Sequence, residues 1–209
     1  MAHQHPELSR LVEVMAILRR QCPWDAEQTH SSLVQYLIEE TAETVEAIES
    51  GDVDHLREEL GDLLLQVIFH SEIAAESEPG FTIEEVAAGI ADKLIARHPY
   101  VFAAEPTPAD LYGTWEERKA AEKGRSSVLE GIPDQLSALA RAGKIISRVR
   151  LRRVDLGLPS EPIEAAEVGE QVLALVARAQ ASGIDPDQAV RAAVRSLEAA
   201  VRAAEDPHR

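Results

Sequence analysis

Residues 31–50 read SSLVQYLIEETAETVEAIES, and residues 56–76 read LREELGDLLLQVIFHSEIAAE. In both segments the apolar residues recur every three or four positions, which is the periodicity of a helix with one buried face. Gly51 follows the first segment as a typical helix stop, and Asp52 or Asp54 can cap the second. The two segments therefore predict a pair of adjacent amphipathic helices.

The rest of the chain has the same helical character. Apolar residues recur at threes and fours from residue 8 to residue 20. Thr82 and Glu85 have the spacing of a capping box, for a helix that reaches about Arg97. A short helix is expected around residues 115–123. Because no segment alternates with period two, we predict an all-α fold, a helical bundle.

The composition of the chain is strongly acidic. The 37 Asp and Glu residues outnumber the 21 Lys and Arg residues, which gives a formal charge of -16. Such a surface repels phosphate backbones and anionic lipids, so we expect no nucleic-acid and no membrane partner. The single Cys22 allows no internal disulfide, and the N-terminal segment lacks the apolar run of a signal peptide or membrane span. We therefore expect a cytoplasmic protein.

Gly, Ser and Pro residues punctuate residues 124–133, and we place a domain boundary there. The predicted domains are residues 1–124 and residues 125–209, the second beginning with a linker. The second half looks like an imperfect repeat of the first, since residues 144–148 align with residues 16–20, but about one helix is missing farther on. We therefore predict a degenerate second helical repeat at the C-terminus.

Carboxylates fall on the helix faces that the apolar residues mark as buried. Glu40 and Glu43 are three residues apart, as are Glu59 and Asp62, so each pair projects from one face. Buried carboxylates need a compensating cation, and their oxygens are the ligands that Mg²⁺ or Mn²⁺ prefers. The set contains no His or Cys, which disfavours zinc. The spacing alone is equally compatible with two solvated acidic faces.

Two further pairs of residues have the spacing of one helical turn. Lys93 and Arg97 form one pair, and Trp115 and Lys119 form the other. A Lys/Arg pair on one face can bind phosphate oxygens, but it equally suits the dipole at a helix C-terminus. Trp115 suits either stacking on a nucleotide base or packing at the end of the bundle.

The motif Glu39-Glu40-x-x-Glu43, followed by Glu59-x-x-Asp62, resembles the metal motif of the all-α nucleoside triphosphate pyrophosphohydrolases. Four flanking motifs look specifically like those of the MazG family. They are Cys22-Pro-Trp-Asp25, Glu27-Gln-Thr-His30, Arg97-His-Pro-Tyr-Val-Phe102 and Trp115-Glu-Glu-Arg-Lys119. The resemblance covers residues from about 8 to 124 and implies that residues 1–124 form a MazG-like catalytic domain.

The resemblance implies Mg²⁺-dependent hydrolysis of nucleoside triphosphates, aberrant ones among them, to the monophosphate and pyrophosphate by attack at the α-phosphorus, with Mn²⁺ as a substitute metal. It also implies a homodimer. Residue by residue, the implied roles are metal binding by Glu40, Glu43, Glu59 and Asp62, triphosphate binding by Lys93, Arg97 and Lys119, and a place near the nucleotide for Trp115. Glu39 is either a further metal contact or the group that orients the attacking water.

The second half departs from the pattern of two tandem MazG domains. A second EExxE helix is absent, and Ser196 and Ala200 stand at the positions that match Lys93 and Arg97. We therefore predict that residues 125–209 are catalytically silent and serve packing or dimerisation. The arginines that follow residue 147 are interpreted as a solvated helix end or a partner-binding strip. They are Arg148, Arg150, Arg152 and Arg153.

Two alternatives to a pyrophosphohydrolase remain. One is a non-enzymatic helical interaction or regulatory module with a structural acidic cluster. The other is a di-iron carboxylate bundle, which needs Glu-x-x-His on two helices. Glu27 and His30 have that spacing but lie near a helix start, so this alternative ranks last.

Overall fold

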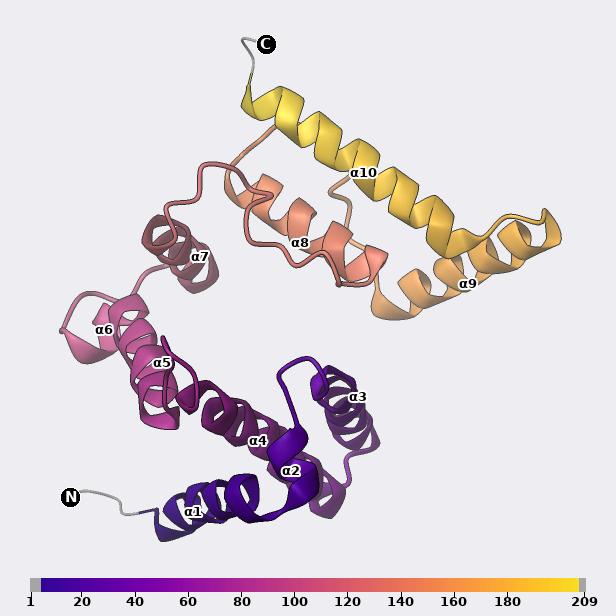
Figure 1. The fold of residues 1–209 in the computed structure, drawn as a ribbon. Coiled ribbons are helices and arrows are strands. Elements are labelled where there is room, and N and C mark those ends of the chain that lie inside the picture. The colour runs from indigo at the N-terminus through magenta and orange to yellow at the C-terminus, as the bar shows by residue number, and fades with distance from the viewer. Residues whose placement is uncertain (1–4, 207–209) are drawn as a thin grey trace. The chain divides into compact units, whose positions relative to one another are not determined.

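The computed structural model describes residues 5–206, and the chain forms two compact units, unit 1 (Met1–Glu105) and unit 2 (Pro106–Arg209). The described residues form ten helices and no strand, which confirms the all-α prediction (Figure 1). No helix in this described part is long and apolar enough to cross a membrane.

Unit 1 is built around a helical hairpin. Its helices are α1 (Pro6–Gln21), α2 (Pro23–Glu27), α3 (Val34–Ser50), α4 (Val53–Ala75), α5 (Ile83–Arg97) and α6 (Pro99–Phe102). Between α3 and α4, Gly51 adopts a left-handed φ of 73°, and the Asp52 side chain accepts hydrogen bonds from the backbone N–H groups of Asp54 and His55. The predicted stop and cap are therefore confirmed, and α3 and α4 pack side by side (Figure 1).

The core of unit 1 lies where α1 and the start of α3 pack against α4. Its most buried members are Met15, Leu33, Ile68, Phe69 and Ile73. Phe69 and Ile73 are one helical turn apart on α4, as expected for a helix with one buried face. Because this core holds α4 against α1 and the start of α3, it sets which side chains of α3 and α4 face each other.

Unit 2 contains α7 (Leu111–Glu122), α8 (Ala138–Leu151), α9 (Ala165–Ala181) and α10 (Pro186–Glu205). Its core joins α8, α10 and the loop before α8, with Ile145 and Val201 completely buried. Figure 1 shows α10 lying along α8.

The boundary between the units differs from the predicted domain boundary. Helix α7, which we expected in the first domain, belongs to unit 2. The reason is tertiary contact, because the Tyr112 hydroxyl lies 3.2 Å from Ser147 Oγ, and Glu116 pairs with Arg148 at 3.8 Å. The Gly- and Pro-rich stretch after α7 is a loop inside unit 2 rather than a linker between units.

Candidate metal centre

The helical hairpin of unit 1 brings three of the predicted metal ligands together. Glu40 and Glu43 project from α3 and Glu59 projects from α4, and one carboxylate oxygen of each lies within 4.8 Å of the others. The three-residue spacing places the first two on one face, and the close packing of α3 on α4 brings the third opposite them. The hairpin therefore brings Glu59 close to Glu40 and Glu43, although they lie on different helices.

Burial increases from α3 to α4 across this cluster. Glu43 is exposed, Glu40 is half-buried and Glu59 is only 7% exposed. His55 Nε2 lies 3.1 Å from Glu59 Oε1, one helical turn away on α4. The other oxygen of this carboxylate, Oε2, is buried and has no hydrogen-bond partner among the described residues.

Without a cation, the carboxylates of the cluster repel one another. The pKa of Glu40 is raised, first by burial and then by the surrounding carboxylates. In order of effect these are Asp62, Glu43, Glu59 and Glu39. The two remaining acidic residues of the motif are therefore near enough to Glu40 to act on it, although they are outside the group of three.

The donor set fits a hard divalent cation. Three carboxylates converge, a buried oxygen among them lacks a donor, and no Lys or Arg pairs with the three in the described structure. Oxygen ligands of this kind suit Mg²⁺ or Mn²⁺. Glu40, Glu43 and Glu59 would hold such an ion, with Asp62 one helical turn from Glu59.

The predicted phosphate ligands lie outside this cluster. Lys93 is exposed on α5, and Arg97, at the end of the same helix, is buried. Trp115 and Lys119 lie on α7 in unit 2, where the Lys119 Nζ sits 4.5 Å from the centre of the Trp115 ring. Lys119 also pairs with Glu116 at 3.6 Å. The roles inferred for these four residues stay predictions.

Sequence reasoning missed His55, although its four-residue spacing from Glu59 is a readable signal on a helix. It also missed the pair formed by His30 and His70, whose Nδ1 atoms lie 2.8 Å apart with stacked rings. His30 precedes α3 and His70 lies on α4, so no local pattern connects them.

Fold and site together define an all-α protein with an acidic centre suited to divalent metal. A sequence profile of the MazG nucleotide pyrophosphohydrolase domain matches residues 28–102. The chain is also 37% identical over 209 residues to the nucleoside triphosphate pyrophosphohydrolase/pyrophosphatase MazG of Thermotoga maritima, covering 90% of this chain and 81% of that protein. The chain belongs to the MazG family, which confirms the resemblance seen in the sequence.

The chain is also similar to other proteins. An uncharacterised 26.1 kDa protein of Streptomyces cacaoi is 46% identical over 200 residues, covering 93% of this chain and 81% of that protein. A nucleoside triphosphate pyrophosphohydrolase of Mycolicibacterium smegmatis is 42% identical over 93% of this chain, which spans 61% of that longer protein. The crystal structure of a mazG-related protein from Thermotoga maritima aligns with 53% of this chain and 97% of its own, at 28% identity and a TM-score of 0.47.

Proposed function

We propose that this protein hydrolyses nucleoside triphosphates, with ribose or deoxyribose and aberrant nucleotides among them, to the monophosphate and pyrophosphate. The observation that carries the proposal is the convergence of Glu40, Glu43 and Glu59 from two helices in a member of the MazG family. Relatives named as nucleoside triphosphate pyrophosphohydrolases support the substrate class.

The proposed cofactor is Mg²⁺, with Mn²⁺ as a substitute, held by the three converging carboxylates and Asp62. A divalent ion there supplies neutralisation of the negative charge on the α-phosphate and the departing pyrophosphate. The orphaned Oε2 of Glu59 supports this assignment, because a buried carboxylate oxygen without a donor is costly unless a cation occupies the space beside it.

The protein's own side chains would position the substrate. Lys93, Arg97 and Lys119 would contact the triphosphate, since cationic side chains offset charge on phosphate oxygens. Trp115 would lie near the nucleotide. Glu39, adjacent to Glu40 and exposed, would either contact the metal or orient the water that attacks the α-phosphorus.

We also propose that the protein is a cytoplasmic homodimer without a nucleic-acid partner. The charge of -16 supports the last point, because it opposes binding to phosphate backbones. Sedimentation of the full chain measures the oligomeric state directly.

The experiment is a panel of nucleoside triphosphates with and without Mg²⁺, with the products identified by chromatography. Monophosphate and pyrophosphate are the expected products, and diphosphate or orthophosphate would contradict attack at the α-phosphorus. Glu40→Gln and Glu59→Gln should reduce turnover to background. Glu58→Gln is the matched control, because this neighbour of Glu59 is exposed and outside the cluster. Absence of turnover by the wild type, with stability independent of Mg²⁺, would instead favour an interaction module.

A further inference from the structure

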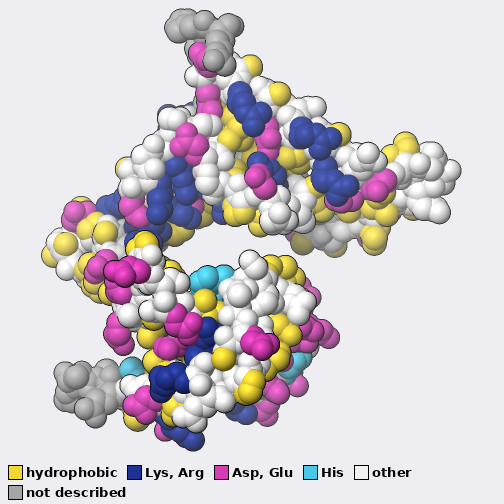
Figure 2. Space-filling model, viewed as in Figure 1, with side chains coloured by type: hydrophobic (Ala, Val, Ile, Leu, Met, Phe, Trp, Pro, Cys, Tyr) yellow, Lys and Arg dark blue, Asp and Glu magenta, His cyan; other side chains and the backbone are white. Residues whose placement is uncertain are grey.

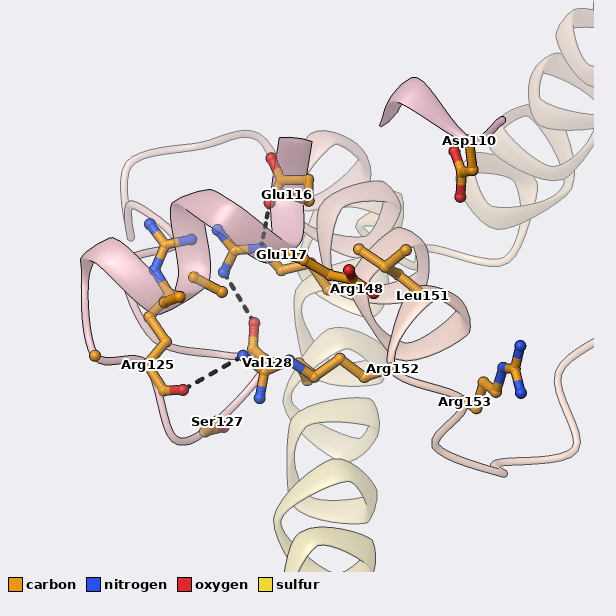
Figure 3. Close-up of a pocket in the computed structure, with 13 residues that line it drawn as sticks. Asp110, Glu116, Glu117, Arg125, Ser127, Val128, Arg148, Leu151, Arg152 and Arg153 are labelled. Carbon is orange, nitrogen blue, oxygen red and sulfur yellow. Dashed lines mark hydrogen bonds and ion pairs between the residues drawn. The ribbon is translucent and has the colours of Figure 1, made fainter. Parts of the chain in front are cut away.

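Unit 2 contains a cavity of about 660 Å³ that the proposed function does not use. It lies between the C-terminal end of α7, the loop that follows, and the C-terminal end of α8 (Figure 3). Four arginines line it, and they come from two separate segments of the chain. They are Arg125 from the loop and Arg148, Arg152 and Arg153 from the end of α8.

Two of the three carboxylates that line this arginine cavity already have hydrogen-bond or ion-pair partners. Asp110 caps α7, where its Oδ1 accepts a hydrogen bond from the Gly113 N–H at 2.8 Å. Glu116 is buried between Lys119 at 3.6 Å and Arg148 at 3.8 Å. The third carboxylate, Glu117, is exposed.

Three of the four guanidinium groups, in contrast, form no ion pair with a carboxylate in the described structure, and of these Arg125 acts on Glu130, whose pKa its charge helps to lower. Within residues 5–206, the side chains of Arg125 and Arg153 form no hydrogen bond or ion pair. Arg152 donates from Nη2 to the backbone carbonyl of Arg125 at 3.3 Å, which leaves its charge uncompensated. The open part of the cavity is therefore richer in unpaired positive than unpaired negative charge.

Arg148 lies at the buried base of the cavity. Its Nη1 donates to the carbonyls of Val128 at 2.9 Å and Glu130 at 2.8 Å, and the residue is only 7% exposed. Its Nη2 has no hydrogen-bond partner in the described structure. Burial lowers the pKa of Arg148, and the charge of Arg125 lowers it further. A solvated helix end is therefore the wrong interpretation for this residue.

The charge of the chain is divided unevenly between the units. Unit 1 contains six Lys and Arg residues against 21 Asp and Glu, whereas unit 2 contains 15 against 16. On the face seen in Figure 2, Lys and Arg side chains gather over unit 2. The strong negative charge that opposes anion binding thus belongs to unit 1.

We propose that the arginine cavity of unit 2 binds the diphosphate group of a small phosphorylated ligand through Arg125 and Arg152, which lie beside each other in Figure 3, with the unpartnered Nη2 of Arg148 at the base. Guanidinium forks match phosphate oxygens in geometry and charge, and several of them around one cavity favour a ligand with more than one phosphoryl group. A volume of about 660 Å³ is within the range of small-molecule sites and admits free pyrophosphate or a nucleotide. The proposal does not depend on the metal centre.

Isothermal titration calorimetry of the full chain in EDTA tests the proposal, because the carboxylate cluster then holds no metal. The probes are inorganic pyrophosphate, ADP and inorganic phosphate. We expect pyrophosphate or ADP to bind more tightly than phosphate. The double variant Arg125→Gln/Arg152→Gln should weaken that binding roughly a hundredfold, because each of the two charge-assisted contacts contributes about a factor of ten.

The matched control is Arg178→Gln/Arg195→Gln, which removes two charges from exposed residues of unit 2 that do not line the cavity. It should bind the probes as the wild type does. Tighter binding of ADP than of pyrophosphate identifies a nucleotide ligand, and the reverse identifies free pyrophosphate; both support the site.

Three results would overturn it. The first is no preference for a diphosphate over phosphate, and the second is equal affinity in the cavity variant and the wild type. The third is loss of binding in Lys93→Gln/Arg97→Gln with the cavity variant unaffected, which would assign the anion to unit 1. The proposed hydrolysis is measured separately, so its failure would not resemble any of these outcomes.

Discussion

Replacing Glu59 by Gln should change the stability of the protein in opposite directions with and without metal. At 4.8 Å, the separation within which the cluster oxygens lie, two unit charges repel by about 1 kcal/mol in a water-like dielectric. Glu59 has two such neighbours, Glu40 and Glu43, so the substitution should relieve about 2 kcal/mol in the metal-free protein. The amide oxygen can still accept a hydrogen bond from His55, which limits the accompanying loss.

With Mg²⁺ the order should reverse. A ligand present at 100 times its dissociation constant stabilises the native state by about 2.7 kcal/mol. For a unit of this size that corresponds to a rise in melting temperature of about 10 °C. The wild type should show this rise, and Glu59→Gln should lose most of it because the most buried ligand no longer carries a charge.

Scanning calorimetry of the full chain, in EDTA and in a Mg²⁺ series, measures both effects. Glu58→Gln makes the same chemical change at an exposed neighbouring position and should behave as the wild type. The reasoning fails if Glu59→Gln keeps the full Mg²⁺-dependent rise, or if it melts lower than the wild type in EDTA.

Three further predictions follow from single contacts. His55→Ala should weaken Mg²⁺ affinity about tenfold, because hydrogen-bond partners of metal-binding carboxylates contribute factors of this order. Calorimetric titration with Mg²⁺ measures the affinity. Arg57→Ala, at an exposed position on the same helix, is the control. Burial, followed by the charge of His30, lowers the pKa of His70. The unfolded chain therefore takes up a proton near pH 6.5 that the native chain does not, and the free energy of unfolding should fall as pH drops below about 7. Urea unfolding should show a shallower fall in His70→Phe, and an unchanged slope would contradict the assignment. Ile145→Ala should destabilise the protein by about 2–5 kcal/mol, because this fully buried side chain fills the core of unit 2. A loss below about 1 kcal/mol in chemical unfolding would contradict this, because it would mean that neighbouring side chains fill the space left by the deleted atoms.

The helices were predictable because their signals are local. Gly51 and Asp52 separate α3 from α4, and Thr82 forms the expected capping box with Glu85 at the start of α5. The boundary between the units was not predictable from punctuation, since Gly124 marks a turn whether or not the segments on either side pack together. Only the contacts of α7 with α8 place that helix in unit 2.

The carboxylate cluster and the arginine cavity also differ in how far the sequence predicts them. The periodicity of α3 and α4 predicted that Glu40, Glu43 and Glu59 share the faces that meet in the hairpin, and the structure brings them together. For the arginine cavity the signal was incomplete, because one interpretation of the run that contains Arg148, Arg152 and Arg153 was a partner-binding strip, but nothing in the sequence connected Arg125 with it. Arg125 and Arg152 lie on different segments, and the contact between them depends on the fold of the loop between α7 and α8.

Three glutamates of this chain are buried to nearly the same extent, and their partners separate their roles. Glu116 and Glu198 are 7% and 8% exposed, and each has two cationic partners. For Glu198 these are Arg141 at 2.7 Å and Arg202 at 3.5 Å. Glu59, at 7% exposure, has His55 on one oxygen, and no described residue forms a hydrogen bond with the other. Since burying a carboxylate costs several kcal/mol unless its charge is compensated, structural glutamates in this fold carry their own arginines. The missing cation at Glu59, beside two further carboxylates, is what a bound metal ion would provide.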